Sequence, residues 1–215
     1  MDWTRGVPAP PKSMLCHPLP KPRNAAPCSE TCMVVSPTAA PGRALCATQS
    51  PSLSRSSACL TPAHVGDAVL SDDGTRVAQA PLNLLNQTAA WEARDGIGCI
   101  EAPALYSHAD GRHTLFYSGG DWTAGLDGLP YSIGYASCLS PLGPCHKRTQ
   151  DKPWFGPVYN SSVGVGGQEI FHDGDGVPWM VFHAWQKGRA GYQHGGQRTV
   201  RFYPLHELEA IAGPL

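Results

Sequence analysis

The 215-residue sequence contains no run of about 18 apolar residues, which predicts that no helix spans a membrane. The first residues also lack the apolar stretch of about 7 to 15 residues that a secretory signal needs. Charged residues make up only 15% of the chain and the formal net charge is -1, so neither nucleic acid nor an anionic membrane is favoured as a partner. A neutral or weakly charged ligand fits this composition better.

Motifs of several common site classes are missing as well. The nine histidines form no His-Glu-x-x-His pair, and no Gly-x-Ser-x-Gly nucleophile turn is present. Cys28 and Cys32 are four residues apart, which is one spacing of metal ligands. Structural zinc sites combine two such close pairs, however, and no second pair follows. We therefore expect no metal site among these cysteines.

The composition changes sharply near residue 64. Residues 1–63 hold 11 of the 21 prolines, five of the eight cysteines and Trp3 as the single Phe, Trp or Tyr residue. This segment has six Lys and Arg against two Asp and Glu, whereas the remainder has ten against fifteen. A chain so poor in large apolar groups cannot build a core. We predict that residues 1–63 are disordered or non-native sequence and that residues 64–215 form the globular domain.

Three features predict an extracellular protein despite the missing signal. Cys138 and Cys145 bracket a Ser-Pro-Leu-Gly-Pro loop that can bring them within disulfide reach, with Cα atoms about 4.4 to 6.8 Å apart. Asn86-Gln-Thr88 and Asn160-Ser-Ser162 are glycosylation sequons. Because these features conflict with the start of the chain, we expect the native N-terminus to have been lost or replaced.

Two stretches, residues 104–118 and 169–183, repeat each other without a gap at an offset of 65 residues. In both, a short apolar run reaches an Asp-Gly turn and an apolar-aromatic run follows, which predicts a β-hairpin. A hairpin repeat longer than about 40 residues favours a β-propeller, whose blades contain about four antiparallel strands each. The predicted strands are 81–85, then 99–106, 113–118 and 131–136 in the first unit, and 168–171, 179–183 and 198–203 in the second.

Helix is expected only at residues 205–211. Two units do not close a ring, because propellers have about four to eight blades and an open array leaves sheet edges and apolar faces uncovered. We therefore expect the chain to be a fragment of a propeller.

Glu101 is the leading candidate for chemistry. It precedes an inner strand, at the position that faces the mouth of a propeller channel, among Ile100, Ala102 and Pro103. These neighbours predict a partly desolvated carboxyl with a raised pKa, which suits a general acid near neutral pH. The alternative is an ordinary loop glutamate that pairs with a nearby arginine.

Six segments, taken in order, resemble glycoside hydrolase family 43 across residues 65–215. They are residues 100–105 (Ile-Glu-Ala-Pro-Ala-Leu), 114–119, 131–136, 140–144, 166–170 and 179–185, with Asp175-Gly176 before the last. Members of that family are five-bladed propellers that hydrolyse arabinose- and xylose-containing polysaccharides with inversion. The resemblance therefore implies an all-β chain that forms a partial five-bladed β-propeller, roughly the last two blades, and binds an oligo- or polysaccharide.

The resemblance also implies roles for individual residues. Glu101 is the expected general acid, and Arg198 matches a basic residue of the sugar pocket, with a solvated strand end as the alternative. Gln168 stands where many relatives carry a histidine that contacts a central metal or water, so we expect no cofactor and doubt a calcium site. The family's general base is commonly an Asp followed by Pro, and this sequence has no Asp-Pro pair.

Three further residues are candidate sugar contacts. Trp122 and its counterpart Trp185 occupy corresponding loops, where an indole can stack on a sugar face or be part of the core. His183 ends an inner strand, where it can reach the channel or serve as a structural histidine.

The predicted function is hydrolysis of O-glycosyl bonds by an inverting glycosidase. One alternative is a non-catalytic carbohydrate-binding or inactive remnant that keeps the sugar platform without the base. A protein-interaction propeller is a third reading, and the placement of Glu101 argues against it.

Overall fold

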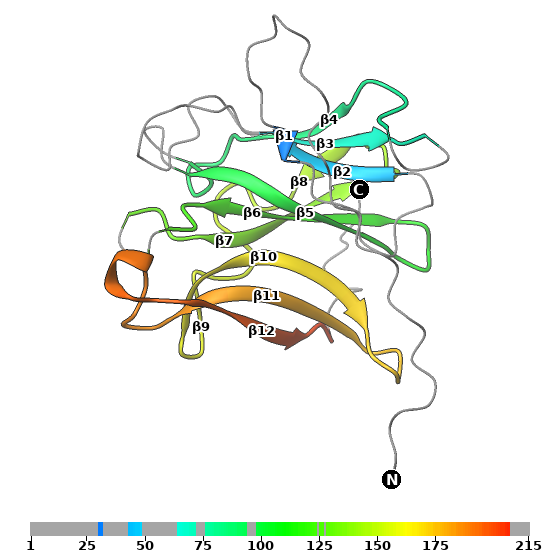
Figure 1. Ribbon diagram of the computed structural model, residues 1–215. Coiled ribbons are helices and arrows are strands. Elements are labelled where there is room, and N and C mark those ends of the chain that lie inside the picture. Colours follow the sequence, from blue (N-terminus) through cyan, green and yellow to red (C-terminus); the bar gives the residue numbers. More distant parts are fainter. Residues whose placement is uncertain are drawn as a thin grey trace, which may run out of the picture.

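The computed structural model describes residues 30–31, 43–48, 64–71, 76–93, 98–123, 125–126 and 128–206. These residues form three four-stranded antiparallel sheets, which lie on one another as three layers (Figure 1). The strand orders are β1-β2-β3-β4, β5-β6-β7-β8 and β12-β11-β10-β9, so each sheet consists of strands that follow one another in the sequence. The helical part of the described chain is one short 3-10 turn, η1 (Tyr192–His194). The predicted all-β class is confirmed.

The first sheet contains β1 (Glu30–Thr31), β2 (Arg43–Thr48), β3 (His64–Val69) and β4 (Leu82–Asn86). β2 pairs with β3 along its whole length, and β4 matches the strand predicted at 81–85. β1 and β2 lie in the segment predicted to be disordered or non-native, and this division of the chain stays a prediction. Backbone groups make the pairing, which is why a segment without a core of its own can cover the edge of β3. The rest of residues 1–63 lies outside the described residues.

The middle sheet contains β5 (Cys99–Ser107), β6 (His113–Gly120), β7 (Ser132–Cys138) and β8 (Cys145–Lys147). The first three confirm the predicted strands of the first unit. The predicted Asp-Gly turn joins β5 to β6, where the amide of His108 donates to the carbonyl of Arg112 at 2.9 Å. β8 has only three residues, too few for a recognisable alternation of apolar and polar side chains.

The last sheet contains β9 (Val158–Tyr159), β10 (Ser162–His172), β11 (Pro178–Gln186) and β12 (Arg198–Pro204). The three strands predicted for the second unit lie within β10, β11 and β12. β10 begins six residues earlier than predicted because its first half is rich in glycine, which is depleted in strands. On β12, the large apolar side chains of Val200 and Phe202 remain 60% and 54% exposed.

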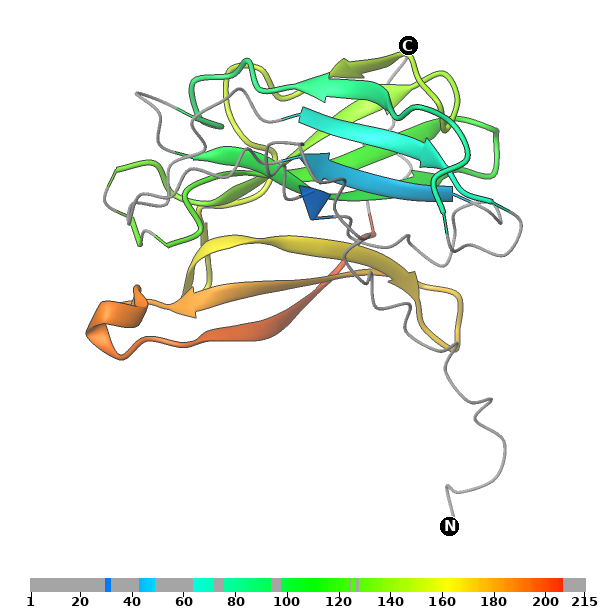
Figure 2. The ribbon, with the colours of Figure 1, turned by 45° about the horizontal axis from the view of Figure 1, so that its top comes forward.

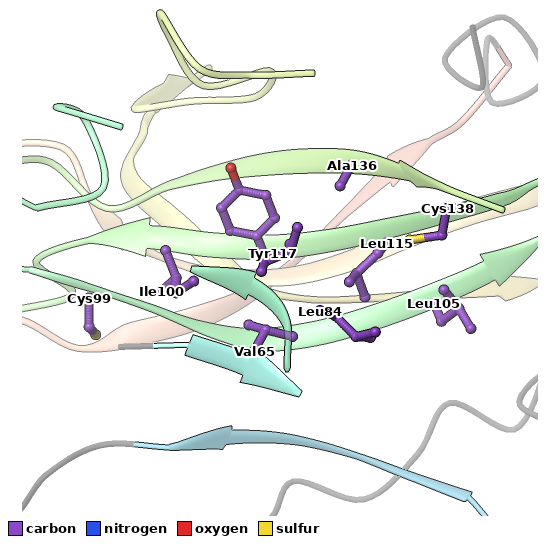
Figure 3. Close-up of a cluster of buried hydrophobic side chains, with 10 residues drawn as sticks. Val65, Leu84, Cys99, Ile100, Leu105, Leu115, Tyr117, Ala136 and Cys138 are labelled. Carbon is purple, nitrogen blue, oxygen red and sulfur yellow. The ribbon is translucent and has the colours of Figure 1, made fainter. Parts of the chain in front are cut away.

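The middle sheet is buried on both faces: the first sheet lies above it in Figure 1 and in front of it in Figure 2, and the last sheet lies below it in both views. One core packs Val65 and Leu84 of the first sheet against side chains that include Leu115 and Tyr117 of β6 (Figure 3). The other core packs Phe116 of β6 against residues of β10 and β11. Successive residues of β6 therefore enter opposite cores, as the two-residue period of a strand requires.

The 65-residue repeat of the sequence is also a repeat of strand register. Glu101 pairs with Ser118, and the next pair of the hairpin begins at Ala104 after a register shift. Gly166 pairs with His183, and the next pair begins at Glu169 after the same shift. Both hairpins thus carry a β-bulge at the same place, which redirects the residue before it.

Residues 207–211 of the helix predicted at 205–211 lie outside the described residues. Leu205, directly after β12, is buried in the core between the middle and last sheets. Within the part of the chain that the structure describes, no helix has the length and apolar character needed to cross a membrane.

Candidate active site

Glu101 lies near the start of β5, at one end of the middle sheet. The antiparallel pairing places this end of β5 beside the end of β6 and the start of β7, since Glu101 pairs with Ser118 and Gly119 pairs with Ser132. Tyr131 directly precedes β7 and therefore lies at the same end. The hydroxyl of Tyr131 donates a hydrogen bond to Oε1 of Glu101 at 2.7 Å.

The bulge after Glu101 places its carboxylate away from the core of the first sheet. Ile100 and Leu105 both belong to that core although they are five residues apart, which an unbroken strand does not permit. Ala102 makes the bulge with a φ of 50°, in the left-handed region that glycine usually occupies. Ile100 is therefore buried and Glu101 is partly exposed.

Gln168 fixes this bulge from the second unit. Its Nε2 donates to the carbonyl of Ala102 at 2.8 Å, and its Oε1 accepts from the hydroxyl of Ser118 at 2.7 Å. The same hydroxyl accepts from the amide of Gly167 at 2.8 Å. Gln168 is buried, and both ends of its amide have protein partners. A direct contact with substrate stays a prediction for this residue.

A metal ion does not fit the position of Gln168. The amide oxygen is directed at Ser118, and among the described residues no three His, Cys, Asp or Glu side chains gather as metal ligands. We therefore derive no chemistry through a metal ion. The expectation that no cofactor is needed stays a prediction.

The phenol of Tyr131 is a buried hydrogen-bond donor. Burial and the negative charge of Glu101 raise the pKa of Tyr131 well above its ordinary value. The hydroxyl therefore keeps its proton at neutral pH and donates it toward the carboxylate. The contact is a charge-assisted hydrogen bond whenever Glu101 is ionised.

Arg198 and His183 pack against the Tyr131 ring. The guanidinium carbon of Arg198 lies 5.3 Å from the centre of that ring, and the His183 ring stacks on it at 6.3 Å and 14°. Nε of Arg198 donates to Nδ1 of His183 at 2.6 Å. Burial and the nearby Arg198 charge lower the pKa of His183 to about 4. His183 is thus neutral at neutral pH, and its Nδ1 serves as an acceptor.

The long loop after β6 is anchored by the backbone of Trp122. Its carbonyl accepts from Nη1 of Arg198 at 2.9 Å and from the indole Nε1 of Trp185 at 3.1 Å. Trp185 is fully buried and therefore belongs to the core, which was the alternative to a sugar contact. The Trp122 indole is partly exposed and meets the ring of Tyr192, which is 58% exposed, edge to face at 6.2 Å.

The structure brings five of the residues singled out in the sequence into this region. They are Glu101, Trp122, Gln168, His183 and Arg198, joined by the contacts above. Their substrate roles stay predictions. Sequence reasoning missed Tyr131, although its place at the start of the third strand of the first unit puts it at the Glu101 end of the sheet.

Cys138 and Cys145 lie at the opposite end of the middle sheet. They are strand partners on β7 and β8, and their sulfur atoms form a disulfide with Cα atoms 4.1 Å apart. This separation is slightly below the expected range; the two residues sit directly opposite each other on adjacent strands, where Cα atoms come as close as about 4.5 Å. Cys99, at the other end, is buried.

One buried glutamate belongs to the framework of the middle sheet. Glu92 is fully buried, forms an ion pair with Lys147 and accepts a hydrogen bond from the hydroxyl of Tyr117 at 2.7 Å. The amides of Thr88 and Ala89 also donate to it, at 2.8 and 3.0 Å. These partners account for its charge within the protein, so we assign this cluster to stability.

Comparison with known proteins places the fold. The family described as "Glycosyl hydrolases family 43" matches residues 63–205. A thermostable family-43 glycoside hydrolase is similar over 77% of this chain and 51% of its own, with 22% identity and a TM-score of 0.61. An endo-1,4-β-xylanase from Bacteroides thetaiotaomicron is similar over 81% and 53%, with 19% identity and a TM-score of 0.56. An endo-arabinase from the same organism is similar over 77% and 52%, with 19% identity and a TM-score of 0.52.

These likenesses show that the fold is a partial five-bladed β-propeller, as predicted. The chain spans about half the length of the three solved structures. A search of curated proteins gave no significant match.

Proposed function

This chain belongs to glycosyl hydrolases family 43, and we propose that it carries the general acid of a glycosidase that cleaves arabinose- or xylose-containing saccharides with inversion. The observation that supports this most directly is the placement of Glu101. A partly exposed carboxyl, at the end of a sheet and held by a buried phenol at 2.7 Å, has the geometry of a positioned proton donor.

The chemistry assigned to Glu101 is proton transfer to the leaving group. As the bond between the anomeric carbon and the glycosidic oxygen breaks, its electron pair goes to that oxygen, which takes the proton of the Glu101 carboxyl. An inverting enzyme also needs a second carboxylate, about 6.5 to 9.5 Å from the first, to activate the attacking water. We propose that this base belongs to a part of the propeller that the chain lacks, since the sequence has no Asp-Pro pair and the solved relatives are about twice as long.

A carbohydrate-binding remnant without catalysis is the second candidate. The observation in its favour is that the site as described has one carboxylate in a position to act on substrate, while the loop that Arg198 contacts carries the aromatic ring of Trp122, which is in contact with the ring of Tyr192. Aromatic faces bind sugars without any acid or base. Binding without turnover would identify this alternative.

The Cys138–Cys145 disulfide supports an oxidising compartment, and we propose that the protein is extracellular. Both sequon asparagines, Asn86 and Asn160, are exposed and available to glycosylation.

The test compares the chain with its Glu101→Gln variant on two substrates, an activated aryl glycoside and a natural oligosaccharide. We expect very weak turnover by the chain, because one positioned acid contributes only about 10²- to 10⁴-fold. Glu101→Gln should reduce it most for the oligosaccharide, whose leaving oxygen must be protonated. Fusion to the missing blades should raise the turnover and keep this dependence.

Glu169→Gln is the matched control, because Glu169 is a partly exposed carboxylate in the corresponding strand of the second unit. It should leave both rates unchanged. Equal, small losses on both substrates in Glu101→Gln would remove Glu101 from the acid role. Oligosaccharide binding measured by calorimetry, with no turnover in the restored protein, would favour the remnant.

A further inference from the structure

We propose that Tyr131 is a positioning residue that determines which oxygen of Glu101 carries the transferred proton. The inference rests on the proposed acid role of Glu101. Its basis is a single contact: the Tyr131 hydroxyl donates to Oε1 of Glu101 at 2.7 Å.

The donor is held in a fixed place. Tyr131 is 2% exposed, and its ring is flanked by Arg198 at 5.3 Å and His183 at 6.3 Å. On the side of β10 the ring lies against the backbone, since a Cβ added to Gly166 would come within 2.0 Å of its Cε1. A ring so enclosed cannot swing away, so its hydroxyl is a fixed point for the carboxyl of Glu101.

The fixed donor makes the two carboxyl oxygens inequivalent. Oε1 accepts the Tyr131 proton, and a proton on Oε1 itself would compete with that bond for the oxygen's lone pairs. The acidic proton therefore resides on Oε2, which becomes the oxygen that meets the glycosidic oxygen. In the transfer, the Oε2–H bond breaks, a bond between that hydrogen and the leaving oxygen forms, and Glu101 is left as a carboxylate.

The same bond also favours the transfer. Negative charge develops on Glu101 as the proton leaves, and hydrogen bonds to charged acceptors are roughly twice as strong as neutral ones. Tyr131 therefore stabilises the transition state more than the ground state, which is the condition for acceleration. Its loss should reduce kcat and leave KM nearly unchanged.

The direct test measures the titration of Glu101 in the intact chain. With glutamate labelled at the side-chain carboxyl carbon, the Glu101 signal is the one absent from Glu101→Gln. Tyr131→Phe keeps the ring and removes only the hydroxyl, so the pKa of Glu101 should rise by about one unit as a bond to its charged form is lost. In the fusion used to test the function, the alkaline limb of the kcat/KM profile should move upward with it.

Tyr117→Phe is the matched control, because it removes the same kind of bond between a buried tyrosine and Glu92. It should lower stability and leave the Glu101 titration unchanged. If Tyr131→Phe does not fold, the wild-type chain still tests the contact. The Tyr131 Cζ signal should then shift with the midpoint of the Glu101 titration and stay flat in Glu101→Gln.

The outcomes separate the two proposals. An unchanged Glu101 titration in folded Tyr131→Phe, or a flat Tyr131 signal in the wild type, overturns the role of Tyr131 alone. A shifted titration together with Glu101-independent turnover in the fusion overturns the acid role, and the positioning role with it.

Discussion

The two units of the chain share one backbone feature, a β-bulge in the hairpin, and differ in the residue that precedes the bulge. In the first unit the residue paired just before the bulge is Glu101, and in the second it is Gly166. The bulge itself has a left-handed residue in both, Ala102 with a φ of 50° and Gly167 with a φ of 65°. The backbone geometry is therefore independent of the chemistry placed on it.

The difference between the units follows from what surrounds each bulge. Gly166 has no side chain because the Tyr131 ring occupies the place where one would be, and His183 lies in the same way against Gly167. Glycine at these two positions of the second unit leaves room for the rings of Tyr131 and His183. One bulge carries Glu101, the proposed acid, and the other provides the backbone surface against which Tyr131 packs.

Gly166→Ala should have the largest effect on the packing between the two units. The new methyl group would lie 2.0 Å from Cε1 of the enclosed Tyr131 ring, so the ring or the strand must move. We expect a loss of about 3 kcal/mol in the free energy of unfolding, the upper range for overpacking a core. Urea unfolding measures it. Gly174→Ala is the control, because nothing lies within 4 Å of the added methyl there, and an equal loss in both variants would contradict the packing argument.

Acidification should break the contact between His183 and Arg198. The pKa of His183 is about 4 in the folded chain against 6.5 ordinarily, so the unfolded state binds a proton first as the pH falls. Stability present above about pH 6.5 is then lost as the pH falls toward 4, by about 2 kcal/mol after allowance for partial solvent exposure. Unfolding midpoints at several pH values should show this slope, and His183→Gln should reduce it. Equal slopes in the two proteins would remove His183 as the cause.

Reduction should affect the first unit and spare the second, because the Cys138–Cys145 disulfide closes only the outer edge of the middle sheet. A short cross-linked loop stabilises by about 2 kcal/mol through the entropy of the unfolded chain. The double replacement of both cysteines by serine should lower the urea midpoint accordingly. Amide exchange should accelerate in β7 and β8 and remain unchanged in β11 and β12. Uniform acceleration would argue against this local effect.

Ala102→Gly gives the first bulge the glycine that the second one has, and it should change the stability least. An alanine in the left-handed region costs about 1 to 2 kcal/mol, which glycine avoids. Glycine also raises the entropy of the unfolded chain, which lowers stability by about 0.4 to 1 kcal/mol. The net stabilisation should therefore be about 0.5 kcal/mol. A precise denaturant midpoint, measured in replicate, resolves this gain. A loss of stability would show that the Ala102 methyl group contributes packing that outweighs its strain.

The sequence was sufficient for the features that depend on local pattern. The Asp-Gly turns and the alternation of apolar residues predicted six strands of the two units, and the sequon and cysteine positions needed only residue counting. Glu101 was found because an isolated carboxylate before an apolar strand is conspicuous. The resemblance to the family located Arg198 and Gln168, whereas Trp122 and His183 were singled out by their places on a loop and at a strand end.

The contacts between the units could not be predicted in the same way. That Gln168 binds the carbonyl of Ala102, or that Tyr131 packs against Gly166, depends on how two sheets meet, and no short-range spacing encodes it. β1 and β2 were not predicted because their pairing with β3 uses backbone groups, which every sequence has.

The exposed side chains of β12 bear on how the protein behaves in a concentrated solution. Val200 and Phe202 lie on a strand that is at the edge of its sheet within the described residues, and both are more than half exposed. Apolar groups on an open strand edge favour contact between native molecules. Colloidal stability should therefore decline before conformational stability does. Salts such as sulfate, which strengthen apolar burial, should lower the concentration at which light scattering begins.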